Sequence, residues 1–255
     1  MLSPANQEIL QVLKNLHSKR ELVGCFNDIP IEVYHHPECP GISSTQIKTV
    51  LKRSISHLKH AKEDTEELTF GRLFHAFISE PWTIQNAKSS DVLLAKKMFD
   101  NMMKHPVIRA LMRGAKHEVT FFSYDQETGL LKKCRADGIN DLDAGYSPIV
   151  FDFKTTKNAS LDSFTSDCKR FNYRLSAAYY LEIISEVYGS RTEDFRLIAC
   201  EKEEPCEAAI YRVHSRSLEE ANNEIRIALN KIKEAIDKGE SAWTGYSLNA
   251  IDILI

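Results

Sequence analysis

Apolar residues recur at helical spacing through the first half of the chain. Over residues 44–61 they fall three or four positions apart behind a run of hydroxyl residues that suits a helix N-terminus, so we predict a capped helix there. A second helix is predicted to begin near Thr69, to carry His75 and to end before Pro81. Further helices are predicted over residues 90–103 and in a short segment after Pro106.

The pattern changes after residue 117, where β-branched and aromatic residues predominate. Residues 117–124 and 130–139 predict the strands of a hairpin, and the apolar run at 148–153 predicts a third, buried strand. A long helix that begins at about residue 161 or 171 and ends at 188, strands over 195–201 and 207–214, and an amphipathic helix over 218–238 complete the series. This order of elements predicts a single α/β domain with an N-terminal helical cover.

The composition excludes several classes of protein. The chain has 255 residues, of which 43% are hydrophobic and 27% charged, and its formal net charge is -3, so disordered, collagen-like and coiled-coil chains are excluded. No overall basic excess indicates nucleic-acid binding, although a locally positive groove or bound metal ions can offset acidic ligands.

Two features of the sequence predict where the protein resides: the lack of targeting patterns and the distribution of cysteines. No run of 18 apolar residues occurs, so we expect no membrane span, and the N-terminus lacks the pattern of a secretion signal. The six scattered cysteines favour reduced thiols in the cytoplasm. Because no Cys-x-x-Cys occurs, neither a zinc ribbon nor an iron–sulfur cluster is expected.

Two carboxylates and one amine are predicted to meet on neighbouring strands. Asp137 falls near the end of the hairpin, and Asp152 and Lys154 flank Phe153, so the latter two leave the same face of their strand. Metal-dependent hydrolysis of a phosphodiester uses such a set, because acidic oxygens hold Mg²⁺ or Mn²⁺ and a lysine adds positive charge at the phosphate. A surface ion pair is the alternative. The apolar residues before Asp152 favour a functional role, since unpaired buried charges are costly.

Four segments stand out together: GRLFHAFISEP at 71–81, EVT at 118–120, TGLLKKCRAD at 128–137 and DFKTT at 152–156. In order and approximate spacing they resemble the RecE-type exonuclease (exodeoxyribonuclease VIII) family of the PD-(D/E)xK nuclease superfamily. The resemblance implies a PD-(D/E)xK nuclease core, which is a mixed β-sheet flanked by helices. It also implies a single exonuclease domain over residues 41–255, preceded by an N-terminal extension over residues 1–40.

The resemblance also implies residue roles. The implied metal ligands are His75, Asp137, Asp152, Glu118 and the backbone carbonyl of Phe153. Lys154 corresponds to the catalytic lysine, which acts with His75 and the two aspartates. For His75 the alternative is a core histidine on an apolar helix face, and for Glu118 it is a surface role on the hairpin.

The helix after the catalytic strand departs from the related nucleases. They carry Gln-x-x-x-Tyr there, whereas this chain has Ser176 at the glutamine position and Tyr180 at the tyrosine position. Lys169, Arg170 and Arg174 on the same segment, with Tyr180, are candidates for DNA contacts. A solvated helix face is an equally good interpretation of the three cations.

Taken with the residues, the resemblance implies a Mg²⁺-dependent exodeoxyribonuclease. Such an enzyme digests one strand of linear duplex DNA 5′ to 3′ and leaves 3′ single-stranded tails for annealing-type recombination. Its implied partners are double-stranded DNA ends, a single-strand annealing recombinase of the RecT kind and further copies of the chain in a ring. The alternatives are a RecB-like or CRISPR-associated nuclease of the same core and a catalytically silent DNA-binding module.

Overall fold

In the part of the chain that the structure describes, six strands form one mixed sheet. The computed structural model describes residues 2–60, 65–84, 87–140, 147–239 and 243. The strands are β1 (Gly24–Phe26), β2 (Lys116–Tyr124), β3 (Leu131–Asn140), β4 (Ile149–Thr156), β5 (Asp194–Glu201) and β6 (Ala208–Arg212). They lie in chain order across the sheet, and β4 and β5 run parallel while every other neighbouring pair is antiparallel.

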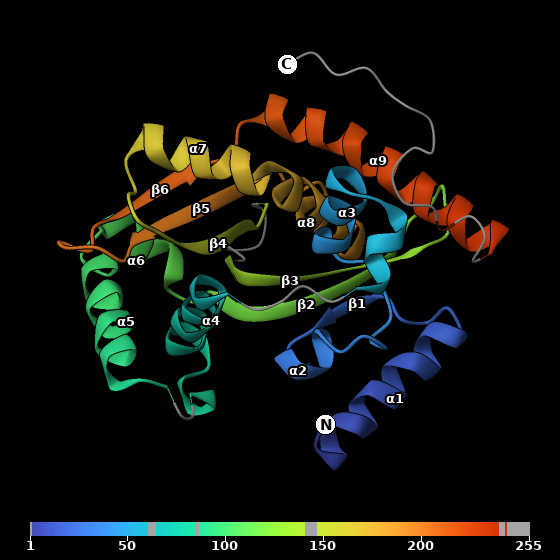
Figure 1. The fold of residues 1–255 in the computed structure, drawn as a ribbon, viewed down its shortest axis with the longest axis horizontal. Helices are drawn as coiled ribbons and strands as arrows, with labels where there is room; N and C mark the ends of the chain where they lie inside the picture. The colour runs from blue at the N-terminus through green and yellow to red at the C-terminus, as the bar shows by residue number, and fades with distance from the viewer. Residues whose placement is uncertain (1, 61–64, 85–86, 141–146, 240–242, 244–255) are drawn as a thin grey trace.

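Helices cover both faces of the sheet (Figure 1). They are α1 (Pro4–Ser18), α2 (Ile31–Tyr34), α3 (Ser44–Lys52), α4 (Glu66–Ser79), α5 (Ser89–Met102), α6 (Pro106–Met112), α7 (Leu161–Phe171), α8 (Tyr173–Tyr188) and α9 (Ser215–Lys238), with 3-10 turns η1 (Ile55–Lys59) and η2 (Pro81–Thr83). This mixed sheet with flanking helices has the architecture that the sequence motifs imply. Among the described residues, no helix has the length and apolar character needed to cross a membrane.

Successive side chains along each strand point to opposite faces of the sheet, where they join three apolar clusters. Val150 of β4 joins the cluster formed with α3, α8 and α9, whereas Phe151 and Phe153 join the cluster formed with α4, α5 and α6 on the opposite face. On the same side as Phe151, Phe122 of β2 packs with α1 and α2. One face is therefore covered by α3, α8 and α9, and the other is shared between two separate groups of helices.

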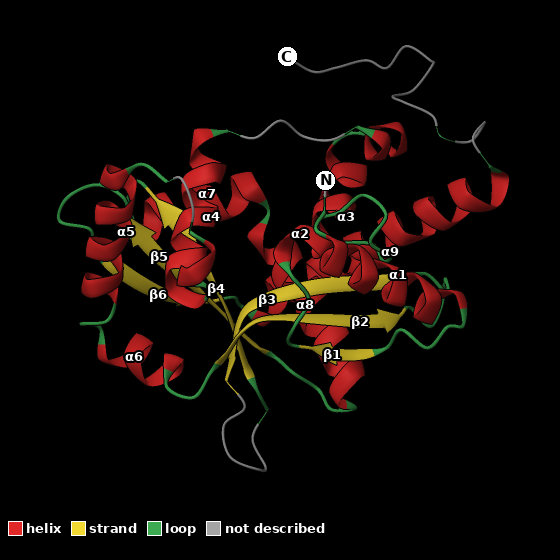
Figure 2. Cartoon of the chain, turned by 90° about the horizontal axis from the view of Figure 1, so that it is seen from below, coloured by secondary structure: helices red, strands yellow, loops and turns green. Residues whose placement is uncertain are grey.

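The sheet divides between β3 and β4. These two strands pair over only three positions, from Gly138 with Phe151 to Asn140 with Ile149. Before Gly138, β3 pairs with β2 on one side and meets Ile42 on the other, where the Ile42 N–H donates to the Leu131 carbonyl at 2.8 Å. After Phe151, β4 keeps β5 as its partner. Figure 2 shows the resulting arms, β1–β3 and β4–β6, spreading from one crossing point.

Most predicted elements are present, and two predicted helices are interrupted. The helix expected over 44–61 ends at Lys52 because Arg53 leaves helical geometry (φ −132°, ψ −106°), and η1 follows it. The long helix expected to end at 188 is broken at Asn172, whose left-handed backbone (φ 51°) separates α7 from α8. The helix expected near residue 69 begins at Glu66, since the Thr65 hydroxyl accepts from the Leu68 N–H.

Residues 1–40 contain elements that the apolar pattern does not predict. The strand β1 pairs with β2, and α1 and α2 pack beside it on the same arm of the sheet. The boundary between an extension and the nuclease domain at residue 40 stays a prediction.

Gly138 must lack a side chain because the ring of Phe151 lies against it. A Cβ at Gly138 would stand 2.0 Å from Cζ of the buried Phe151. We expect Gly138→Ala to lower the free energy of unfolding by about 1–3 kcal/mol, measured in urea. Gly71→Ala is the matched control, since its Cβ would meet only Thr155 Oγ1 at 3.8 Å and alanine favours a helix. A Gly138→Ala protein as stable as the wild type would contradict this packing.

Candidate metal centre

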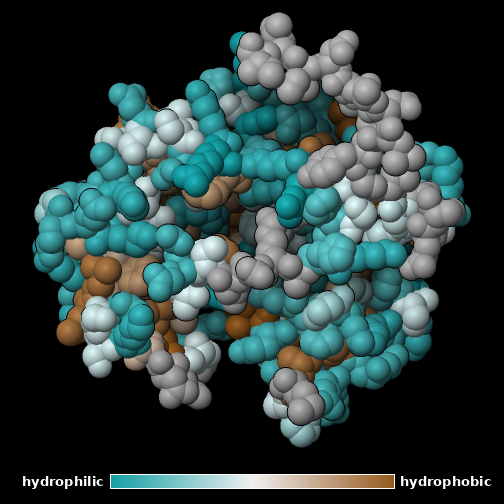
Figure 3. Space-filling view, viewed as in Figure 1, coloured by the Kyte–Doolittle hydropathy of each residue, from teal (hydrophilic) through white to brown (hydrophobic). Residues whose placement is uncertain are grey.

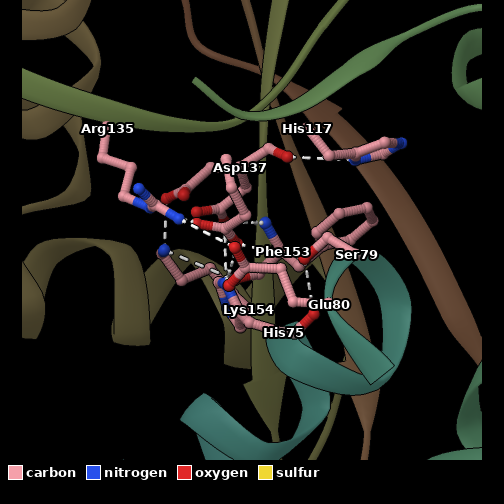
Figure 4. A network of polar contacts seen from close by, with 10 residues as sticks. His75, Ser79, Glu80, His117, Arg135, Asp137, Phe153 and Lys154 are labelled. Atoms are coloured by element: carbon pink, nitrogen blue, oxygen red, sulfur yellow. Dashed lines mark hydrogen bonds and ion pairs between the residues drawn. The ribbon is translucent and has the colours of Figure 1, made fainter. Parts of the chain in front are cut away.

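Three potential metal ligands converge where the two arms of the sheet separate. His75 comes from α4, Glu118 from β2 and Asp137 from β3, and one ligand atom of each lies within 4.8 Å of the others. His75 Nδ1 is 3.4 Å from Asp137 Oδ2 and 4.0 Å from Glu118 Oε1. Figure 4 shows His75 and Asp137 within one network of polar contacts. This geometry differs from that of a core histidine bonded only to backbone.

Packing of α4 on β4 sets the position of the histidine. Phe74 is fully buried in the cluster that contains Phe153, and the next residue, His75, turns its ring edge-on to the Phe153 ring. His75 Nε2 lies 3.0 Å from the Phe153 carbonyl oxygen, a hydrogen bond that fixes the ring. The second ring nitrogen, Nδ1, thereby faces Asp137.

The carboxylate of Asp137 occupies the gap between β3 and β4. Its Oδ2 accepts a 2.8 Å hydrogen bond from the backbone N–H of Phe153, at a level where the two strands no longer pair. His117 Nδ1 lies 3.0 Å from the Asp137 carbonyl oxygen. Hydrogen bonds therefore hold both the carboxylate and the backbone carbonyl of Asp137, so that the carboxylate stays between β3 and β4.

Glu118 reaches the cluster through an unusual backbone conformation. Its φ is 54°, within β2, where a non-glycine residue costs about 1–3 kcal/mol. Its carboxylate accepts from Arg135 Nε at 2.7 Å and from the Ser79 hydroxyl at 3.3 Å. The hairpin surface role is thus wrong for the side chain, which is buried with a specific set of partners.

Asp152 and Lys154 approach from the other side of the sheet. By strand alternation they leave the same face as Val150, and their side chains form an ion pair. Lys154 Nζ also donates to the Phe153 carbonyl at 3.4 Å. Asp152 lies close enough to Asp137 for its carboxylate to raise the pKa of Asp137. Asp152 is outside the three-residue cluster, but it adjoins that cluster through Asp137.

The close charges shift the acidities of the group. Burial and the Asp152 carboxylate raise the pKa of Asp137 to about 7. Burial alone would lower the pKa of His75, but the Asp137 carboxylate outweighs it and raises that pKa to about 9. Burial likewise opposes ionisation of Asp152, yet the Lys154 ammonium lowers the pKa of Asp152 to about 2. Asp152 keeps the pKa of Lys154 above its usual range in spite of burial.

The donor set fits a divalent cation. Carboxylate oxygens are the ligands that Mg²⁺ prefers, and one imidazole among them is also compatible with Mn²⁺. The Asp137 carboxylate, which raises the pKa of His75, would attract a bound cation in the same way. His75, Glu118 and Asp137, with Asp152 beside them, are the residues that would hold the metal. The Phe153 carbonyl already accepts from His75 and Lys154.

The predicted DNA-contacting residues differ in their surroundings. Lys169 and Arg170 are exposed at the end of α7. Arg174 forms an ion pair with Glu224 of α9, and Tyr180 packs edge-on against Phe195 in the core. A role for these residues in DNA binding stays a prediction.

Arg135 belongs to the site, although the sequence motifs imply no role for it. It is 6% exposed and binds Glu118, and its Nη2 lies 3.2 Å from Glu80 Oε1. Its position in the sequence could have predicted this role, because Arg135 lies two positions before Asp137 within a predicted strand. A buried cation there needs anions as partners. Arg135 offsets two carboxylates of the acidic group and orients Glu118.

Comparisons with known proteins place the chain in a family. Residues 43–247 match the family model described as "PDDEXK-like domain of unknown function (DUF3799)", so the chain belongs to this family of PDDEXK-like domains. No protein with a curated description matches it. The crystal structure of a "Putative exonuclease" from Eubacterium rectale is similar, with a TM-score of 0.62 and 15% identity over 80% of this chain and 86% of that one. At this identity the likeness concerns the fold.

A second solved structure, of the protein SSO0001, has a TM-score of 0.31 and 18% identity over 72% of this chain and 84% of that one. Family membership confirms the PD-(D/E)xK superfamily expected from the sequence motifs and suggests a nuclease. Nucleases of this superfamily use divalent metals, in agreement with the cluster of His75, Glu118 and Asp137.

Replacing either aspartate should remove a ligand and leave the fold intact. We expect Asp137→Asn and Asp152→Asn each to weaken Mn²⁺ binding at least about tenfold in calorimetric titrations. In Asp137→Asn the new amide oxygen can still accept from the Phe153 N–H, and loss of one charge relieves repulsion, so this variant should melt no earlier than the wild type. Asp100→Asn, at a carboxylate that pairs with Lys96 on the surface, is the control. Unchanged Mn²⁺ affinity would remove the altered aspartate from the ligand set.

Metal binding should depend on pH through His75. Because a cation must displace protons whose pKa values are about 9 on His75 and about 7 on Asp137, Mn²⁺ affinity should rise as the pH rises from 6 to 9 and then level off. His75→Ala should bind Mn²⁺ more weakly and lose the part of this dependence near pH 9. If His75→Ala only melts early and keeps wild-type Mn²⁺ affinity, the histidine is a packing residue.

Proposed function

We propose that the protein is a metal-dependent exodeoxyribonuclease of the RecE kind. The observation that carries the proposal is the cluster of His75, Glu118 and Asp137 within 4.8 Å, which the Asp152–Lys154 pair meets through the gap in the sheet. The enzyme would digest one strand of linear duplex DNA 5′ to 3′ and leave 3′ single-stranded tails for annealing-type recombination. This polarity and this role rest on the resemblance of the four sequence motifs.

Each residue of the site has a task that follows from its contacts. A divalent cation, Mg²⁺ or Mn²⁺, held by His75, Glu118, Asp137 and Asp152 supplies Lewis-acid chemistry for phosphodiester hydrolysis. Lys154 stays positively charged, because Asp152 overcomes the effect of burial and raises its pKa, and it stabilises negative charge that develops on the phosphate. The Phe153 N–H holds the Asp137 carboxylate, and Arg135 holds that of Glu118.

Mainly hydrophilic side chains cover the face of the molecule that Figure 3 shows. We infer that duplex ends approach the site from this face. The partners proposed with this activity are double-stranded DNA ends, a single-strand annealing recombinase of the RecT kind and further copies of the chain in a ring. We propose that the protein acts in the cytoplasm.

Two other functions use the same fold. A RecB-like or CRISPR-associated nuclease would share the core and the ligands, and a silent DNA-binding module would share only the core. The charged residues argue against the silent module, because Asp137, Asp152 and Arg135 are only 8%, 6% and 6% exposed and each has a charged partner.

The proposal is tested with linear and covalently closed circular duplex DNA. We expect the purified protein to degrade linear DNA from its ends in Mg²⁺, to leave circles intact and to be inactive in EDTA. Lys154→Ala is the informative variant: its rate should fall about 100-fold or more, while DNA binding in Ca²⁺ stays within a few-fold of wild type.

The other outcomes discriminate among the alternatives. Cleavage of closed circles would indicate an endonuclease, and digestion from 3′ ends of strand-labelled DNA would contradict the RecE-like polarity. No cleavage under any metal condition, with intact DNA binding, would support the silent module.

A further inference from the structure

An aromatic pair lies at the break between α7 and α8, beside Lys154. Phe171 is the last residue of α7 and Tyr173 the first of α8, and their rings stack with centroids 5.7 Å apart. The left-handed Asn172 between them makes this geometry possible. Phe171 is 44% exposed, so an aromatic surface is available beside Tyr173, whose ring contacts Lys154.

Cations from three elements surround these two rings. The guanidinium of Arg170 stands 5.2 Å from the Phe171 centroid. Lys154 Nζ of β4 stands 5.3 Å from the Tyr173 centroid, and Lys48 Nζ of α3 stands 5.8 Å from the same centroid. Aromatic rings flanked by cations are the combination with which proteins bind single-stranded nucleic acid, since rings stack on bases and cations attract phosphates.

Tyr173, the inner ring of the pair, packs against the core, and the end of α7 is fixed by a hydrogen bond. The buried Phe164 contacts the Tyr173 ring at 6.2 Å between centroids and stacks on Tyr211 of β6 at 5.3 Å. Lys52 Nζ of α3 donates to the Arg170 carbonyl at 2.7 Å and fixes the end of α7. A prearranged ring loses little conformational entropy when a base stacks on it.

Exposure alone would not distinguish Phe171, because isolated apolar side chains are common on protein surfaces. Leu161, at the other end of α7, is 63% exposed and takes part in no such arrangement among the described residues. Phe171 differs in its stacking on Tyr173, in the guanidinium above it and in its link through Tyr173 to the catalytic lysine.

We propose that Phe171, supported by Tyr173, binds an unpaired base of the DNA strand whose phosphate lies at Lys154. This proposal rests on the proposed nuclease function and adds a property to it: the substrate is a DNA end with at least one splayed or overhanging nucleotide. Arg170 and Lys48 attract the phosphates that flank this nucleotide.

The test measures stacking directly in EDTA, where no cleavage occurs. Duplexes carry 2-aminopurine in a short 5′ or 3′ overhang, and stacking lowers its fluorescence. We expect wild-type protein to quench one of these overhangs, and Phe171→Ala to lose the quenching and to bind that DNA about 5- to 100-fold more weakly. Blunt duplex binding should change less than about twofold. Phe171→Trp should restore quenching and affinity, and Leu161→Ala should behave as wild type.

The outcomes separate this inference from the nuclease assignment. Wild-type protein that degrades linear DNA but quenches neither overhang, or a Phe171→Ala protein that quenches and binds like wild type, overturns the stacking site alone. Overhang quenching that depends on Phe171 in a protein that never cleaves DNA supports the site and overturns the nuclease. A Phe171-dependent preference for RNA overhangs over DNA overhangs would overturn the assignment to DNA.

Discussion

The separation of β3 from β4 is the constraint on which the site depends. Two neighbouring strands that stop pairing leave buried backbone groups without partners, and such groups must be satisfied. Here the N–H of Phe153 is taken by the Asp137 carboxylate, and its carbonyl accepts from His75 and Lys154. The groups that replace the missing strand contacts are therefore the groups that build the candidate metal centre.

The gap also lets side chains from opposite faces of the sheet meet. Glu118 and Asp137 belong by alternation to the face covered by α4, whereas Asp152 and Lys154 belong to the face covered by α8. In a continuous sheet the backbone would keep these two groups apart. Their meeting places four carboxylates, counting Glu80, against Arg135, Lys154 and a protonated His75. A divalent cation bound among these carboxylates would supply positive charge in place of the proton of His75.

The sequence predicts the strands of the core and the central carboxylates, because both leave local signals. Strand alternation alone predicts that Asp152 and Lys154 share a face, and the resemblance adds His75. The break at Asn172 is less visible, since asparagine can continue a helix and only the surrounding packing selects its left-handed geometry. The burial of Glu118 is equally hidden, because it depends on a positive φ and on Arg135, Ser79 and α4, which lie elsewhere in the chain. The strand β1 is only three residues long, too short for a periodic pattern.

The central claim is that the gap between β3 and β4 holds a divalent cation, and anomalous diffraction from crystals soaked in Mn²⁺ tests it most directly. The account predicts a manganese peak within coordination distance of the Asp137 and Glu118 carboxylates, on the side of Asp137 that faces His75. A peak elsewhere on the protein, or a gap that stays without manganese in crystals of a protein that cleaves DNA in Mn²⁺, would contradict it.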